Sequence, residues 1–258
     1  MPDVHATAIV DPKARLGANV RIGPWSLIGP DVALGDGVEV GAHVVVTGRT
    51  TVGPRTRIFP FAAVGGDPQD KSFAGESTEL LIGADNVIRE HVTIHVGTPR
   101  GGGSTRLGDD NLIMNGCHIG HDCSIGSHCI FAAFTGLAGH VVVEDHVVLA
   151  AYTGVHQFAR VGESVMAAAN AKISKDCAPF SLIAGDRARL AGVNVVGLRR
   201  RGFSPETVRA IRRAYHVLFY SKLRFEPALA RVREEGMTAP EVQRLVAFLE
   251  KSERGFTR

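Results

Sequence analysis

An aliphatic side chain recurs at every sixth position near the start of this chain. The run consists of Val10, Leu16, Ile22, Ile28, Leu34, Val40, Val46, Val52, Ile58 and Val64. An α-helix repeats every 3.6 residues and an alternating strand every two, so neither produces a sustained period of six. A fixed period of this kind is typical of a stacked repeat architecture. The chain is therefore predicted to be a solenoid of hexapeptide units.

Each unit supplies one short strand and one turn. The residue two before each aliphatic is small or β-branched, as with Ser26 before Ile28, and both point inward because strand side chains alternate. Glycine often follows the aliphatic, as at Gly23 and Gly53. Glycine and asparagine at the corners are expected to allow the positive backbone angles that a repeated sharp turn demands. Successive coils of three units would pair in parallel about 4.8 Å apart. The architecture resembles the left-handed parallel β-helix, an all-β solenoid.

The hexad pattern is interrupted twice and then stops. Residues 65–79 and 97–104 are two excursions without the expected aliphatics, and the second contains three consecutive glycines. Loops inserted in a solenoid usually cluster on its binding face. We expect the repeat domain to span 1–190. Residues 191–258 instead show helical periodicity, which predicts a C-terminal α-helical cap over the open end of the solenoid.

Helix start signals support this cap. Ser204 followed by Pro205 is typical of an N-cap with proline in the first turn. Thr238 with Glu241 three residues later has the pattern of a capping box. A further helix is expected around 225–235.

Charge is distributed unevenly. Residues 1–184 carry 13 Lys and Arg against 18 Asp and Glu, whereas 185–258 carry 16 against 8. A basic tail indicates an anionic partner, and the lack of interleaved aromatics argues against a single-stranded nucleic acid. No apolar run approaches the roughly 20 residues that span a bilayer, so no transmembrane segment is expected. Three cysteines at hexad spacing (Cys117, Cys123 and Cys129) are expected to fill the core, which fits a reducing cytoplasm.

Histidines concentrate in the second half of the repeats. Counting hexads by threes stacks Ile94, Ile119, Leu137 and Val155 on one face. Five histidines beside these positions are then predicted to line one outer seam: His95, His118, His121, His140 and His156. His128 and His146 fall on other faces and are expected to be ordinary corner residues.

Two chemistries use a histidine seam. Imidazole transfers protons near neutral pH and is also the commonest metal ligand. A metal could be held by His118 and His121 with His95 or His140, as in the similar hexapeptide-repeat carbonic anhydrases. The alternative is acid–base catalysis without metal. A non-catalytic solenoid scaffold would not cluster histidines on one seam.

Several short segments, in this order, carry a specific resemblance over essentially the whole chain. They are Pro68-Gln69-Asp70, Thr93-Ile94-His95, Gly101-Gly102-Gly103, Asp110-Asn111-Leu112, His118-Ile119-Gly120-His121-Asp122-Cys123, Leu137-Ala138-Gly139-His140, Val155-His156-Gln157-Phe158, Gly192-Val193-Asn194 and Arg200-Arg201-Gly202-Phe203. The chain resembles the UDP-N-acetylglucosamine O-acyltransferases that begin lipid A synthesis.

The resemblance implies roles for individual residues. His121 would be the general base, Asp122 its orienting carboxylate, and the backbone N–H of Gly139 the oxyanion hole. Asn194 and Arg200 would contact the nucleotide, Arg200 through phosphate. The full set implied in substrate binding is Gln69, Asp70, His95, His118, His140, His156, Gln157, Asn194, Arg200 and Arg201.

The resemblance also implies substrates and assembly. The donor would be a 3-hydroxyacyl chain on acyl carrier protein, an acidic partner suited to the basic tail. The acceptor would be the 3-position of UDP-N-acetylglucosamine, and neither a cofactor nor a metal would be needed. Family members are homotrimers with active sites between adjacent prisms. A 3-amino sugar acceptor, which would give an amide, and an acyl-CoA donor remain open alternatives.

The sequence departs from the family pattern in three places. The first excursion reads Lys71-Ser72 where the family has Leu-Lys, and Val196 stands where an acidic residue is usual. Acyl length is implied to depend on the segment from Met166 to Asn170, in which Ala169 replaces a common glycine. This replacement predicts a restricted acyl tunnel.

Overall fold

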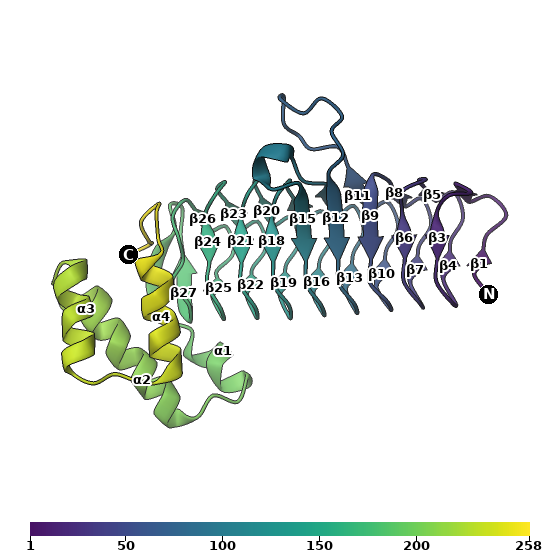
Figure 1. The fold of residues 1–258 in the computed structure, drawn as a ribbon. Coiled ribbons are helices and arrows are strands. Elements are labelled where there is room, and N and C mark those ends of the chain that lie inside the picture. The colour runs from purple at the N-terminus through teal and green to yellow at the C-terminus, as the bar shows by residue number, and fades with distance from the viewer.

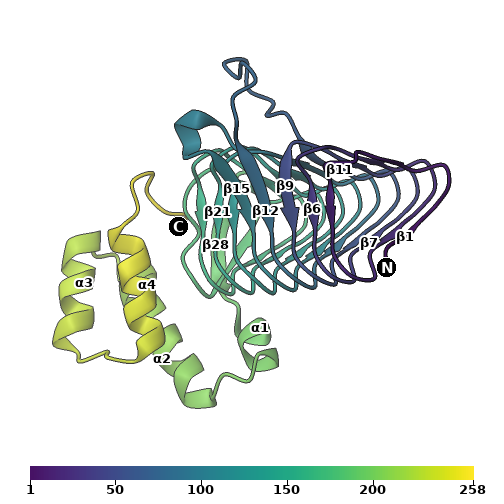
Figure 2. The same ribbon diagram turned by 45° about the vertical axis from the view of Figure 1, so that its right-hand side comes forward.

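A computed structural model describes residues 1–258 and shows a three-sided prism of short parallel strands with helices at one end (Figure 1). Each strand pairs with the strand one coil further on. For example, His118 lies opposite Gly136, and Ile119 lies opposite Leu137. The turned view in Figure 2 shows the coils stacked along one axis. The predicted solenoid of hexapeptide units is therefore confirmed.

Three sheets, named A, B and C here, form the sides of the prism. Sheet A contains β1 (Asp3–Val4), β4 (Arg21–Ile22), β7 (Glu39–Val40), β10 (Arg57–Ile58), β13 (Val87–Ile88), β16 (Leu112–Ile113), β19 (Ile130–Phe131), β22 (Val148–Leu149), β25 (Met166–Ala167), β27 (Ser181–Ala184) and β28 (Arg189–Val193). Sheet B contains β2 (Ile9–Val10), β5 (Leu27–Ile28), β8 (Val45–Val46), β11 (Ala63–Gly66), β14 (Thr93–His95), β17 (His118–Ile119), β20 (Gly136–Leu137), β23 (Gly154–Val155) and β26 (Lys172–Ile173). Sheet C contains β3 (Arg15–Leu16), β6 (Ala33–Leu34), β9 (Arg49–Val52), β12 (Glu79–Ile82), β15 (Ser104–Leu107), β18 (Ser124–Ile125), β21 (Val142–Val143) and β24 (Arg160–Val161).

The inward side chains form one continuous core along the prism. Aliphatic residues from all three sheets pack together in a single cluster of 41 buried residues, and Cys117, Cys123 and Cys129 belong to it. Burial raises the pKa of the Cys123 thiol to about 12, so this thiol stays protonated and packs as an apolar group. Val10 and Leu16 are only half-buried, because the first coil has no coil in front of it.

The recurring glycines act by close approach rather than by positive backbone angles. A Cβ at Gly53 would lie 2.4 Å from the carbonyl carbon of Gly83 in the next coil. Gly53, which follows the aliphatic, has no positive φ. At the corners themselves, the expectation for glycine and asparagine is confirmed at Gly37, Gly116, Asn19 and Asn170, whose φ values are 67°, 67°, 56° and 61°. Many other corners hold larger or charged residues in the same conformation, including Asp122 (φ 61°), His140 (φ 62°) and Phe158 (φ 63°). Most corners therefore carry a full side chain in the left-handed region, and glycine takes this conformation at corners such as Gly37 and Gly116.

Both excursions leave the prism at the same corner, between sheet B and sheet C, which we call the B–C corner. The first joins β11 to β12 and the second joins β14 to β15, and the second contains the short 3-10 helix η1 (Pro99–Gly101). Figure 1 shows the two loops rising side by side from this edge. The corner residues of the next three coils lie at 120–122, 138–140 and 156–158.

The C-terminal segment is helical as predicted. It contains α1 (Val195–Arg200), α2 (Pro205–Tyr215), the π-helical turn η2 (His216–Tyr220), α3 (Phe225–Glu234) and α4 (Pro240–Glu250). The boundary placed at residue 190 falls inside β28, which pairs antiparallel with β27. A second core of 18 buried residues joins the helices to Ala178 and Phe180 of the last coil. None of the helices has the length and apolarity needed to cross a membrane.

One helix start is as predicted and one is not. The Ser204 hydroxyl accepts a hydrogen bond from the backbone N–H of Thr207, which confirms this N-cap. The capping box at Thr238 and Glu241 is wrong, because α4 begins at Pro240 and its N-cap residue, Ala239, has no side-chain cap. Glu241 instead pairs with Arg244 one turn later.

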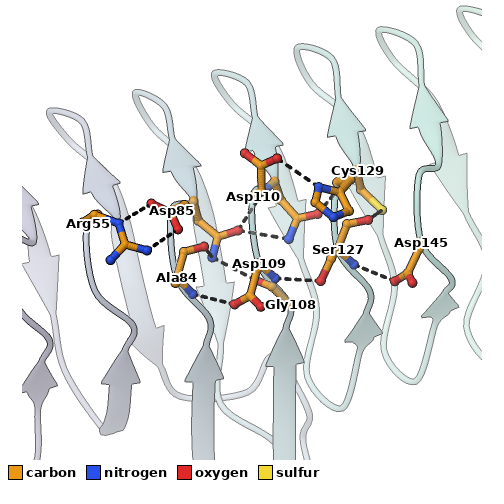
Figure 3. A network of polar contacts seen from close by, with 12 residues as sticks. Arg55, Ala84, Asp85, Gly108, Asp109, Asp110, Ser127, Cys129 and Asp145 are labelled. Carbon is orange, nitrogen blue, oxygen red and sulfur yellow. Dashed lines mark hydrogen bonds and ion pairs between the residues drawn. The ribbon is translucent and has the colours of Figure 1, made fainter. Parts of the chain in front are cut away.

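Polar side chains link successive coils at the corner between sheet C and sheet A, the C–A corner (Figure 3). The Arg55 guanidinium makes two hydrogen bonds to Asp85, at 2.7 and 2.6 Å. Asp109 accepts from the backbone N–H of Ala84, and Asp145 accepts from that of Ser127. Side-chain contacts of these two kinds tie successive coils together at this corner and help hold the register of the stack.

Candidate active site

The predicted histidine seam lies on sheet B and the B–C corner. His118 is on the outer face of β17, and the chain turns directly afterwards so that His121 and Asp122 occupy the corner. The rings of His95 and His118 lie 5.2 Å apart, and those of His121 and His140 lie 5.1 Å apart. The face assignment made from the hexad count is confirmed for these residues.

His121 and Asp122 form a close pair. Nδ1 of His121 lies 2.7 Å from Oδ2 of Asp122. The Asp122 side chain is fully buried, while that of His121 is 16% exposed. Because a carboxylate accepts, this contact places the imidazole proton on Nδ1 and leaves Nε2 free to accept a proton. The arrangement can therefore act as an oriented general base.

Gly139 lies against the imidazole of His121. A Cβ at this position would stand 2.6 Å from Cε1 and 2.7 Å from Nε2 of His121. Only glycine lets the backbone approach the ring this closely. The N–H of Gly139 donates to no carbonyl or side chain of the protein, so it is available to an oxyanion formed beside Nε2.

The remaining seam histidines differ in environment. His140 stacks on Phe158 with ring centroids 4.4 Å apart, and its Nε2 lies 3.8 Å from Asp122. His118 shares a 2.8 Å hydrogen bond with the Thr93 hydroxyl. Burial, together with the nearby His95 and His121, lowers the pKa of His118, so His118 is neutral at pH 7.

A groove of about 880 Å³ runs over sheet B beside this pair. Of the predicted residues, those that line it are Gln69, His95, His118, His121, Gly139, His156 and Gln157. Its floor includes Gly136 and Gly154, whose positions on the outer face of the strands carry no side chain. Lys172 and Arg187 border its end near the last coil. The groove is thus an open trough whose end near the last coil is lined by two basic residues and by Asp186.

Asp70 reaches the same neighbourhood from the first excursion. Its carboxylate accepts from the backbone N–H and the hydroxyl of Ser72, and these bonds lower the pKa of Asp70. His121 and Arg100 lower it further by their charge. Asp70 is therefore ionised, and its neighbour Gln69 lines the groove.

Other predicted residues lie elsewhere in the single chain. Asn194 caps α1 and donates to the Ser164 carbonyl at 2.9 Å, and Arg201 pairs with Glu163 at 2.9 Å. These contacts place both residues beside the C–A corner. The remaining predicted residues outside the groove are Arg200, exposed at the end of α1, Met166 on sheet A, and Ala169 at the corner between sheets A and B.

The one compact set of metal-ligating groups is His121, Asp122 and His140, with donor atoms within 4.8 Å of one another. It differs from the histidine sets considered from the sequence, because His118 and His95 are not part of it. The Asp122 carboxylate already accepts hydrogen bonds from His121 and from Thr98. A metal ion would have to replace these bonds, so the geometry favours a hydrogen-bonded pair.

Family models match both parts of the chain. A bacterial transferase hexapeptide model matches residues 13–48 and 104–139, and a model described as UDP N-acetylglucosamine O-acyltransferase, domain 2, matches 176–257. A protein named acyl-[acyl-carrier-protein]–UDP-N-acetylglucosamine O-acyltransferase from Alkalilimnicola ehrlichii is 52% identical over 258 residues, covering 100% of both chains. The chain belongs to this family. A relative of the same name from Myxococcus xanthus is 49% identical, also over both full chains.

Solved structures of family members share the fold. LpxA from Acinetobacter baumannii is 41% identical with a TM-score of 0.96 and covers 99% of each chain. The UDP-N-acetylglucosamine acyltransferase of Arabidopsis is 34% identical with a TM-score of 0.88, covering 99% of this chain and 100% of the other. The expected left-handed parallel β-helix with C-terminal helices is thereby confirmed.

Some residues of the site were not identified from the sequence. Thr98 contacts Asp122, while Lys172 and Arg187 border the groove. The outward glycines of the floor had a signal, because Gly136 and Gly154 each directly precede an inward aliphatic, where most hexads have a larger residue. No comparable signal marked Thr98, which lies in the excursion where the repeat is lost.

Proposed function

We propose that this protein transfers a 3-hydroxyacyl chain from acyl carrier protein to the 3-position of UDP-N-acetylglucosamine, the first step of lipid A biosynthesis. The observation that carries the proposal is the buried Asp122 beside His121, which opens onto the groove next to the free N–H of Gly139. The relatives' names give the acyl donor and the sugar nucleotide.

The reaction follows from the positions of three groups. Nε2 of His121 takes the proton from the sugar 3-hydroxyl as its oxygen attacks the thioester carbonyl. The N–H of Gly139 stabilises the negative charge on the carbonyl oxygen of the tetrahedral intermediate. Collapse breaks the carbon–sulfur bond, and the imidazolium returns its proton to the thiolate that leaves. Asp122 stabilises the imidazolium, and no metal or cofactor is required because a thioester is already activated.

The groove suits the pantetheine-linked donor. An acyl or pantetheine chain can lie over Gly136, where no atom would stand within 4 Å of a Cβ, and beside Gly154, along which the Lys172 side chain runs. Lys172 and Arg187 are in no ion pair with the protein and can receive a phosphate group. Arg254 of the C-terminal tail reaches His156 at 3.3 Å, which brings a further positive charge to the groove edge. These charges provide a docking side for an acidic carrier protein.

We further propose a homotrimer in which adjacent prisms share each site. Phe61, Phe134 and Tyr152 are each about half exposed along the corner between sheets A and B, as expected of a surface that packs against another subunit. Arg200 and Asn194 lie at a different corner from His121, so they would reach the groove of a neighbouring subunit. The free thiols and the absence of a membrane-spanning helix are compatible with the cytoplasm.

The decisive experiment is a transfer assay with the purified protein. UDP-N-acetylglucosamine and its 3-amino analogue are compared as acceptors, with 3-hydroxyacyl carrier proteins of graded length and the matching acyl-CoA as donors. Product from UDP-N-acetylglucosamine that is lost in His121→Ala supports the proposal, and preference for the 3-amino analogue would replace ester with amide formation. No product from any pair would reject it, and the bound-metal content would then be measured.

The shared site has its own test. Chains carrying His121→Ala and chains carrying Arg200→Ala are co-expressed with different tags, and mixed trimers are purified. If each site uses the two residues from different subunits, one of the three sites in every mixed trimer combines an intact His121 with an intact Arg200, so purified mixed trimers regain about a third of the sites. If both residues act within one chain, mixed trimers are as inactive as either parent.

A further inference from the structure

We propose that the second excursion, residues 97–104, is a clamp that positions the catalytic base, with Thr98 as its central positioning residue. The proposal rests on the role given above to His121. It differs from the usual function of a solenoid insertion, because the contacts of this loop are directed at Asp122 rather than into the open groove.

Thr98 makes two hydrogen bonds to the buried carboxylate. Its backbone N–H donates to Oδ1 of Asp122 at 2.7 Å, and its hydroxyl donates to Oδ2 at 2.7 Å. Oδ2 is also the atom that faces Nδ1 of His121. Thr98 is 3% exposed, so these bonds form away from water, where they are strong and costly to lose.

Further hydrogen bonds fix the position of Thr98 and of the Asp122 backbone. The backbone N–H of Gly101 donates to the Thr98 hydroxyl at 3.2 Å, which leaves the hydroxyl proton for Asp122. In β15, directly after the excursion, the Thr105 hydroxyl accepts from the backbone N–H of Asp122 at 2.8 Å. Asp122 has a φ of 61°, so this bond helps hold a backbone conformation that aspartate rarely adopts.

Gly101 closes the clamp by contact. A Cβ at Gly101 would stand 2.0 Å from Cγ of Asp122 and within 2.4 Å of both carboxylate oxygens. The backbone of the loop therefore lies directly on the carboxylate and leaves no room there for a side chain at position 101. The Asp122 oxygens accept from Thr98 and His121, a set that fixes the imidazole with Nδ1 protonated and Nε2 free.

The test separates the hydroxyl from the volume of the side chain. Thr98→Val keeps the shape and removes the hydroxyl, whereas Thr98→Ser keeps the hydroxyl and removes a methyl group. We expect Thr98→Val to lower kcat about 10- to 100-fold with KM unchanged, and Thr98→Ser to retain most of kcat. A space-filling role predicts the reverse order, with the valine variant the more active, and would overturn the proposal.

Thr56, another buried threonine of the β-helix, provides a matched control for Thr98. Thr56 is fully buried, donates to the Gly83 carbonyl and accepts from the N–H of Asn86, far from the site. Thr56→Val should lower Tm about as much as Thr98→Val and leave kcat unchanged. If Thr56→Val and Thr98→Val lost kcat equally, the loss would be a general effect of removing a buried hydroxyl. That result would overturn the proposal that Thr98 positions the base.

Two further measurements keep the proposal testable if Thr98→Val folds poorly. Gly101→Ala should lower kcat without raising KM, whereas Gly29→Ala should not, because its Cβ would meet only ordinary contacts at 3.4 Å or more. In the Asp122→Asn background, Thr98→Val should have little further effect, since Thr98 acts through that carboxylate. Additive losses would overturn the proposal. Full activity of His121→Ala would instead refute the proposed base.

Discussion

The molecule contains two hydrogen-bonded His–Asp pairs at equivalent corners of the prism, and only one is built as a base. Nδ1 of His121 lies 2.7 Å from Asp122 at the B–C corner, and Nδ1 of His128 lies 2.9 Å from Asp110 at the C–A corner. The side chains of the first pair are 16% and 0% exposed, and those of the second are 49% and 67% exposed. Distance alone does not distinguish them.

The surroundings of the two carboxylates explain the difference. Asp122 is covered by the second excursion and accepts two bonds from Thr98, whereas the Asp110 carboxylate accepts from His128 alone. A pair of exposed charges in water contributes little and leaves both side chains free to move. Burial with fixed partners strengthens the interaction and selects one imidazole orientation. Catalytic competence is therefore added by the loop over the corner.

The largest contrast is expected between the two histidines. His121→Ala should lower kcat by about 10³-fold, the order of magnitude that a positioned general base contributes. His128→Ala should leave kcat within about twofold of the unmodified enzyme, since His128 stacks only on His146 and touches no groove residue. Steady-state transfer kinetics measure both. Comparable losses in the two variants would remove the distinction between the corners.

The carboxylates should show a smaller contrast of the same kind. Asp122→Asn keeps the size of the side chain but loses its charge, so the imidazolium that forms in the reaction loses its stabilising partner. We expect kcat to fall about 100-fold, with KM little changed. Asp110→Asn should have no effect on kcat. A retained kcat in Asp122→Asn would show that His121 works without an orienting carboxylate.

Whether the acyl donor lies on the groove floor can be tested by comparing a substitution on sheet B with one on sheet C. A Cβ at Gly136 would meet no atom within 4 Å, so Gly136→Val should fold while filling the trough on sheet B. We expect KM for the acyl donor to rise about tenfold, equivalent to about 1.4 kcal/mol of binding, with kcat less affected. Ser124→Val places the same side chain on the outer face of sheet C and serves as the control. An unchanged KM in Gly136→Val would show that the donor does not lie on this floor.

The smallest effect is expected for a substitution of Glu144 at the C–A corner, which should change thermal stability and leave catalysis unaffected. Burial raises the pKa of Glu144, and the neighbouring Glu163 and Asp145 add to this. A raised folded-state pKa means that ionised Glu144 disfavours folding at neutral pH and that this cost disappears once both states are protonated. Glu144→Gln should therefore raise Tm by about 1–3 °C at pH 7 and change it little near pH 4.

Thermal unfolding at the two pH values measures this difference. The amide oxygen of glutamine can still accept from the backbone N–H of Glu163, which lies 2.8 Å from Glu144 Oε2. Glu226→Gln, an exposed substitution at the start of α3, is the control and should leave Tm unchanged at both. An equal shift at pH 7 and pH 4 in Glu144→Gln would contradict the electrostatic explanation.

The repeat could be read from the sequence because its signal is periodic. Each hexad reports the inward position directly, and counting by threes placed His95, His118 and His121 on one seam before any contact was known. Left-handed corners are less readable, because His140, Phe158 and Asp122 have no common composition. The start of α4 was missed since Pro240 fixes the first turn without a side-chain cap.

The rest of the site depends on contacts between segments that carry no period. Thr98 is one threonine in an irregular loop, and only the fold shows that it meets Asp122 from 24 residues away. Arg187 enters the groove through the hairpin between β27 and β28, after the hexads have ended. Asn194 and Arg201 could be expected as binding residues from resemblance, but their place at another corner depends on how many coils precede them.

The corner residues have a consequence for how such a protein changes over evolutionary time. Asp122, His140 and Phe158 share one backbone conformation although their side chains differ in charge, size and hydrogen bonding. A single substitution at a corner therefore exchanges one chemical group for another without rebuilding the chain around it. New specificities can be sampled one corner at a time, while the inward aliphatics keep the scaffold intact.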